Sequence, residues 1–182
     1  GSRELTVTGL IDLEDGEPAK ILESTVMAVS SKGFVLSDGT SAIFVEGKAD
    51  IKAGDHVTIN GNKQTYAGFP SFILDECNVL SSSSAEYPEP VNITSNADEA
   101  LPGFKSPVFI KVDGSNVNGT MRIADQTSRV AVADPTKDQA EALDKVNLHK
   151  TSFTGYYIGV VSKVPSIVLV AVEGDGGIDE SI

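Results

Sequence analysis

The sequence predicts an all-β protein built as two tandem five-stranded barrels. Short runs rich in β-branched and aromatic residues dominate both halves of the chain, with Gly, Asp and Ser between them. The stretch LSDGTSAIFV at 36–45 returns as IADQTSRVAV at 123–132, with Asp, Thr and Ser in the same places. Between the two copies, SSSSAEYPEP at 81–90 changes composition to Ser, Pro and Glu.

The first barrel is expected within residues 1–80. Its strands are expected at TVMAVSS, GFVLSD, AIFVEG, HVTING and FPSFILDECNVL. Gly33 and Gly39 suit the two hairpin turns that join the first three strands, because glycine takes a positive φ at no steric cost. Helix is limited to a turn around 48–52. Residues 81–90 are then expected to form a polar linker that does not pack. The alternative is a long surface loop within a single domain.

The second barrel is expected within residues 91–182. SPVFIKVDG, GTMRIADQTSRVAVAD and TSFTGYYIGVVSKVPSIVLVAV repeat the strand pattern of the first copy. A helix is expected between the third and fourth strands, where Asp134 can cap it and Leu143 and Val146 share one face. The last stretch, EGDGGIDESI, is expected to be a frayed acidic tail.

Five strands with a helix between the third and fourth follow the order of an OB-fold, a partly open Greek-key barrel. The chain resembles OB-fold domains of the tRNA-anticodon and helicase-associated type in GFVLSDGTSAIFV, AGDHVTING and TYAGFPSFIL. The second copy matches mainly through the internal repeat, with Gln126 in place of the turn glycine. Tandem OB-fold proteins secreted by Bacteroidetes are also similar. This resemblance implies the fold and leaves the ligand open, because OB-folds host binders of nucleic acid, sugar and protein.

The chain is strongly acidic, with a net charge of −12. Up to Ser84 there are 6 basic and 12 acidic residues, and after it 8 and 14, so neither half is basic. Such a field disfavours non-specific binding to nucleic acid or to an anionic membrane. The longest apolar runs, such as SIVLVAV, are too short to span a bilayer.

Candidate ligand contacts follow from the alternation of strand residues and from one hairpin. In the first copy Met27, Val29, Phe34, Leu36, Ile43 and Val45 are expected to face inward, and Ala28, Val35, Ser37 and Phe44 outward. In the second copy the outward residues are Phe109, Lys111, Arg122, Ala124, Arg129 and Ala131. The hairpin KQTYAGFP adds Lys63, Tyr66 and Phe69. Aromatic rings can stack on a ligand, and guanidinium groups can clamp phosphate or carboxylate. The eight predicted ligand contacts are therefore the aromatic and basic residues of these sets: Phe44, Lys63, Tyr66, Phe69, Phe109, Lys111, Arg122 and Arg129.

Plainer roles are open for each candidate. Lys111, Arg122 and Arg129 could be a solvated sheet face, and Tyr66 and Phe69 could fold back onto the barrel end or the neighbouring domain. Cys77 is the single cysteine and is expected to be a small buried hydrophobe. No catalytic residue, metal site or cofactor is expected, because the motifs of those chemistries are missing and the two histidines lie in different copies.

The sequence therefore predicts a binding module rather than an enzyme. The expected partner is a polymer: a glycan or protein at the cell surface or in the periplasm, with or without a lipid anchor. Single-stranded nucleic acid is the first alternative, and a structural spacer or adaptor is the second. A cytoplasmic location is the alternative compartment.

Overall fold

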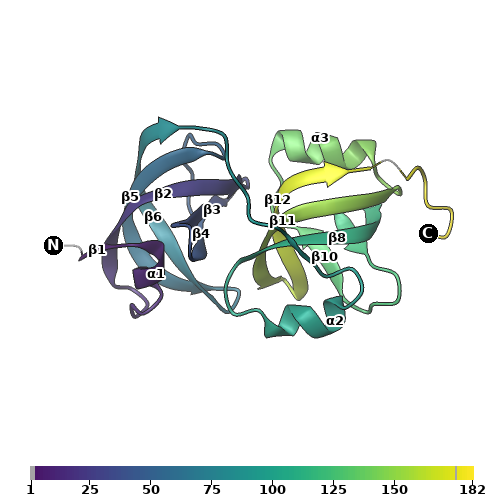
Figure 1. The fold of residues 1–182 in the computed structure, drawn as a ribbon, viewed down its shortest axis with the longest axis horizontal. Coiled ribbons are helices and arrows are strands. Elements are labelled where there is room, and N and C mark those ends of the chain that lie inside the picture. Colours follow the sequence, from purple (N-terminus) through teal and green to yellow (C-terminus); the bar gives the residue numbers. More distant parts are fainter. Residues whose placement is uncertain (1–2, 175) are drawn as a thin grey trace.

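The computed structural model describes residues 3–174 and 176–182 and consists mainly of β-strands (Figure 1). The expected all-β class is confirmed. The first sheet contains β1 (Arg3–Leu5), β2 (Pro18–Val29), β3 (Gly33–Ser37), β4 (Ala42–Glu46), β5 (Asp55–Tyr66) and β6 (Phe69–Ser82). Its strands pair in the order β2, β3, β4, β6, β5, and β5 pairs again with β2, so the sheet closes into a barrel.

The second sheet repeats this order of pairing. It contains β7 (Val91–Asn92), β8 (Val108–Val117), β9 (Thr120–Arg122), β10 (Arg129–Val132), β11 (Lys150–Val161) and β12 (Val164–Glu173). The order is β8, β9, β10, β12, β11, and β11 pairs again with β8. In both barrels one neighbouring pair is parallel, β4 with β6 and β10 with β12.

The longest helix, α3 (Lys137–Lys145), lies in the chain between β10 and β11. Its N-cap is Thr136, whose side chain accepts a hydrogen bond from the backbone N–H of Gln139. The Gln139 side chain accepts one in return from the Thr136 N–H, which completes a capping box. The expected cap, Asp134, lies before the helix with a positive φ of 42°.

Each barrel is preceded by a short strand and a one-turn helix that the sequence analysis did not foresee. These are β1 with α1 (Val7–Leu10), and β7 with α2 (Ala97–Ala100) followed by the 3₁₀ turn η1 (Leu101–Gly103). β1 runs parallel to β2, and β7 runs parallel to β8. Both barrels therefore begin in the same way.

The one-turn helices explain why Thr and Ser recur in the two copies, whereas the recurring Asp has this role only in the first. In the first copy Asp38 accepts hydrogen bonds from the N–H groups of Thr40 and Ser41, at 2.9 and 2.8 Å, and from Thr8 of α1. In the second copy the carboxylate comes from α2, because Asp98 accepts from the N–H groups of Thr127 and Ser128. The Thr-Ser turn thus holds a carboxylate in both barrels and ties each preceding helix to it.

Two apolar clusters fill the barrels, and most of the residues expected to face inward lie in them. The first core includes Val26, Phe34, Leu36, Ile43, Val45 and Phe72, and the second includes Ile110, Val112, Met121, Ile123, Val130 and Phe153. The expectation for Met27 was wrong. A β-bulge between Val26 and Ala28 shifts the alternation, so that Val26 faces the core and Met27 faces away from it.

A third apolar cluster joins the two barrels. It includes Met27, Ala28, Val35, Ala42 and Phe44 from the first barrel and Phe109, Tyr156, Ile158 and Val168 from the second. Polar contacts flank it: Ser31 N–H donates to the Asp134 carbonyl at 2.8 Å, and the Gln139 side chain donates to the Val29 carbonyl at 2.8 Å. The outward faces of the two copies therefore cover one another.

The segment between β6 and β7 runs between the two barrels (Figure 1) and, contrary to expectation, packs against them. Ser83 N–H donates to the Gly54 carbonyl at 3.1 Å. The hydroxyl of Tyr87 donates to the Met27 carbonyl at 2.7 Å, and its ring stacks on Phe109. Along the described residues, no helix is both long and apolar enough to cross a membrane.

Candidate functional site

A groove of about 1080 Å³ lies where the two barrels and the connecting segment meet. Met27, Ala42 and His56 line it from the first barrel, and Phe109 and Tyr156 line it from the second. Residues 83–88 of the connecting segment form a further part of its wall. The groove is therefore a property of the whole chain and is absent from either barrel alone.

Three aromatic rings form an apolar part of the groove. Tyr87 stacks on Phe109 with ring centroids 5.1 Å apart and planes 20° apart, and Phe109 contacts Tyr156, also at 5.1 Å. Burial raises the pKa of Tyr87, and burial together with Tyr87 raises the pKa of Tyr156 to about 12. Both phenols are therefore neutral and able to donate hydrogen bonds at physiological pH.

The rest of the wall is rich in hydroxyl groups. The contributing side chains are Thr25, Ser37, Thr40, Ser41, Ser83, Ser84 and Ser106. His56 lies among them, with Nδ1 at 3.1 Å from the Thr25 hydroxyl and Nε2 at 2.9 Å from the Ser83 hydroxyl. Hydroxyls donate or accept, so they satisfy either tautomer of this ring. The lining residues include Glu86 and no Lys or Arg.

Two of the predicted aromatic contacts lie in the contact between the barrels. Phe109 is 8% exposed and Phe44 is 4% exposed. Phe109 borders the groove, whereas Phe44 packs against Tyr66 with ring centroids 5.1 Å apart. Their expected accessibility on an open sheet face was wrong, because each barrel covers the outward face of the other.

Phe69 reaches into the core of the second barrel. It contacts Tyr157 edge-on at 5.7 Å and belongs to that barrel's apolar cluster, although it lies on β6 of the first. The turn before Phe69 approaches β11 so closely that a Cβ placed on Gly159 would lie 2.5 Å from the Ala67 carbonyl oxygen. The hairpin therefore folds onto the second barrel, which is one of the two alternatives left open by the sequence.

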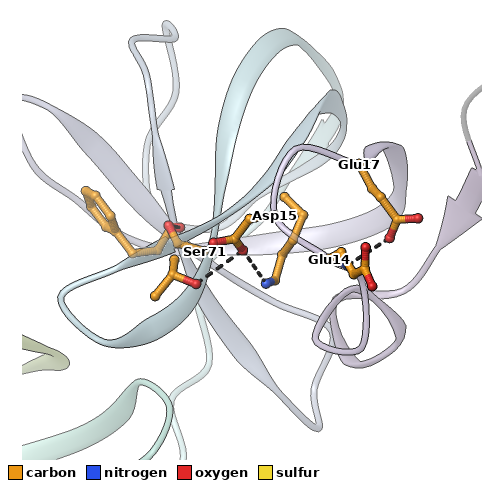
Figure 2. A network of polar contacts seen from close by, with 7 residues as sticks. Glu14, Asp15, Glu17 and Ser71 are labelled. Atoms are coloured by element: carbon orange, nitrogen blue, oxygen red, sulfur yellow. Dashed lines mark hydrogen bonds and ion pairs between the residues drawn. The ribbon is translucent and has the colours of Figure 1, made fainter.

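Lys63 is buried and pairs with a carboxylate instead of facing a ligand. Its Nζ lies 3.1 Å from Asp15, which also accepts a hydrogen bond from Thr65 at 3.2 Å. Figure 2 shows Asp15 in the loop that also holds Glu14 and Glu17. The hydrogen bonds from Lys63 and Thr65 lower the pKa of Asp15, so this carboxylate stays ionised at neutral pH.

The predicted cations of the second barrel lie apart from the groove. Lys111 is half-buried, and Arg122 and Arg129 are exposed. Arg122 borders a separate cavity of about 630 Å³. The eight predicted contacts are therefore dispersed over the contact between the barrels, the second core, a buried ion pair and this outer face.

The sequence analysis missed Tyr87 and His56 as groove residues. Tyr87 is the one aromatic residue in the Ser/Pro/Glu segment 81–90, and a large ring in a polar segment is a sign that the segment packs. No comparable signal distinguishes His56, because its partners come from β2 and from the connecting segment.

Comparisons with other proteins do not supply a family or a role. No protein-family model matches the chain, and no curated protein matches it. Within residues 3–174 and 176–182, no cluster of three His, Cys, Asp or Glu side chains is arranged to hold a metal ion.

Proposed function

We propose that the protein is a glycan-binding module and that the groove between its barrels binds a neutral oligosaccharide. The lining carries the proposal: the half-buried ring of Tyr87, backed by the buried rings of Phe109 and Tyr156, stands beside seven hydroxyl side chains, and no Lys or Arg is among the lining residues. Sugar rings stack on aromatic faces through their C–H groups and exchange hydrogen bonds with hydroxyls. A phosphate backbone needs cations instead.

The groove is of a suitable size for such a ligand. Pockets for small ligands are about 300–1,000 Å³, and this groove reaches about 1080 Å³. The proposed location is the cell surface or the periplasm, where a binding module meets polymeric glycans.

The fold supports an OB-type assignment for both barrels, which is part of the same proposal. Each barrel closes because its first strand pairs with its fourth, β2 with β5 and β8 with β11. Its third and fifth strands run parallel, β4 with β6 and β10 with β12. This pairing agrees with a five-stranded Greek-key barrel, and OB-folds include oligosaccharide binders.

The test is binding of neutral hexasaccharides of glucose, mannose and xylose, measured by calorimetry with the full chain. The variant Thr40→Trp fills the groove from an exposed turn. Its control is Thr127→Trp, at the equivalent turn of the second barrel, which does not border the groove. We expect one sugar to bind, with affinity independent of salt, and Thr40→Trp alone to abolish binding. If no sugar binds, or if the two variants behave alike, the proposal fails.

A structural spacer is the second candidate, favoured by the apolar cluster between the barrels. Nine buried residues from both barrels meet there, and the connecting segment covers one side. Such a contact holds two barrels at a fixed angle, which a spacer between larger partners requires. The spacer role predicts that Thr40→Trp leaves the protein's function intact.

A further inference from the structure

Three cationic side chains stand in one row on the outer face of the second barrel. Strand pairing places Arg129 opposite Arg122, Arg122 opposite Ser115, and Ser115 opposite Lys150. The row points outward, since Met121, the neighbour of Arg122, is fully buried in the core. We call these four residues the cation row. Like charges directly opposite each other on adjacent strands repel, so the row costs stability unless an anion meets it.

Nothing in the described chain neutralises the cation row by an ion pair. The ion pairs within residues 3–174 and 176–182 are Lys32–Asp134, Lys52–Asp55 and Lys63–Asp15. Carboxylates are abundant, with 26 acidic against 14 basic residues. Among the described residues, Arg122, Arg129 and Lys150 therefore form no ion pair, although the protein has many carboxylates.

One carboxylate does lie on the cation row, and it belongs to residues 176–182. The Ser115 hydroxyl donates a hydrogen bond to Asp179. The backbone holds the segment beside the start of β11: Lys150 N–H donates to the Gly177 carbonyl at 2.9 Å, and Asp179 N–H donates to the Leu148 carbonyl at 2.7 Å. The expected frayed tail is thus a docked acidic segment, at least over the described residues 176–182.

The lowered pKa of Asp179 agrees with a carboxylate that Ser115 and Lys150 of the cation row stabilise in its ionised form. Hydrogen bonds from Ser115 and Ser181, with a smaller contribution from the charge of Lys150, lower its pKa to about 2. A carboxylate in this position therefore stays ionised over the physiological range.

The cavity of about 630 Å³ lies beside Asp179 and has a mixed lining. Arg122 and Lys150 contribute positive charge, and Asp113 and Glu173 contribute negative charge one row further along the strands. A run of phosphates would meet repulsion from Asp113 and Glu173. A peptide with one or two carboxylates among polar residues, such as the docked segment itself, fits both rows.

We propose that the cation row is a binding site for an acidic peptide segment of a partner protein, and that residues 176–182 occupy it in this structure until that segment displaces them. The site is separate from the groove and does not depend on the glycan proposal. Its recognition elements are the Ser115 hydroxyl, the two guanidinium groups and the Lys150 ammonium. Its backbone edge is the start of β11, which Gly177 and Ile178 occupy in this structure.

The test uses a fluorescently labelled, end-blocked peptide of sequence GIDESI, titrated into the full chain at low salt. We expect it to bind Asp179→Asn roughly 10-fold more tightly than the unaltered protein, because a charge-assisted hydrogen bond no longer holds the competing segment. In the Asp179→Asn background, Arg122→Gln should abolish binding. Lys163→Gln, which removes the same charge from the exposed turn between β11 and β12, should not.

Four results would overturn the proposal. The first is equal peptide affinity for the unaltered protein and for Asp179→Asn. The second is equal binding of a control peptide that carries Asn in place of Asp. The third is an unchanged affinity in Arg122→Gln. Binding of an oligonucleotide in place of the peptide would likewise contradict it.

Discussion

Replacing Phe69 with Ala tests whether the two barrels share one core. Phe69 belongs to the first barrel by sequence and to the core of the second by contact, where it is 8% exposed. Removing a buried phenyl ring costs about 3–5 kcal/mol through lost burial and the cavity left behind. We take the lower end, because the ring is at the edge of the core. For a chain of this length, about 3 kcal/mol lowers the Tm by about 6–12 °C.

The assay combines thermal unfolding with amide hydrogen exchange. We expect Phe69→Ala to lower the Tm and to speed exchange in β11 around Tyr157, in the other barrel. Ile73→Ala is the matched control, because Ile73 lies on the same strand and is 42% exposed. Its cost should be close to that of a surface change, about 0.5 kcal/mol. A Phe69→Ala effect no larger than this, or faster exchange confined to β5 and β6, would refute the shared core.

Three further predictions address single contacts. Gly159→Ala should lower the free energy of unfolding in urea by about 1–3 kcal/mol more than Gly68→Ala does. Both glycines have positive φ, but only a Cβ on residue 159 would press against the Ala67 carbonyl. Equal losses for the two variants would contradict this. Tyr87→Phe should lower the free energy of unfolding by about 1 kcal/mol, because it loses the hydrogen bond to the Met27 carbonyl. An unchanged free energy of unfolding would mean that water replaces the hydroxyl. The lowered pKa of Asp15 means that its stabilisation is present above the ordinary value of 3.8 and is lost as pH falls through the folded value. Lys63→Met should therefore flatten the decline of stability below about pH 4, and an unchanged decline would exclude the ion pair as its source.

The strand pattern of the barrels could be predicted because it is local. A strand with one buried face must alternate, and Leu36, Ile43 and Val130 obey this rule without reference to the rest of the chain. The β-bulge at Met27 breaks it, because an extra residue depends on the partner strand β3. The one-turn helices α1 and α2 are too short to show a helical period, so no pattern announced them.

The candidate site was harder to predict, because alternation says which side a residue faces and not what lies there. Phe44 and Phe109 face outward as expected, but the other barrel is their neighbour. The composition of the first barrel's outward face did contain a signal for this. Ala28, Val35 and Ala42 surround Phe44 with small apolar groups that offer a ligand no hydrogen bond. The centre of a protein–protein contact has that character, whereas a sugar site needs polar atoms among its rings. In this protein those polar atoms lie at the border of the contact, in the Thr-Ser turn and the connecting segment, and that border is where we place the ligand.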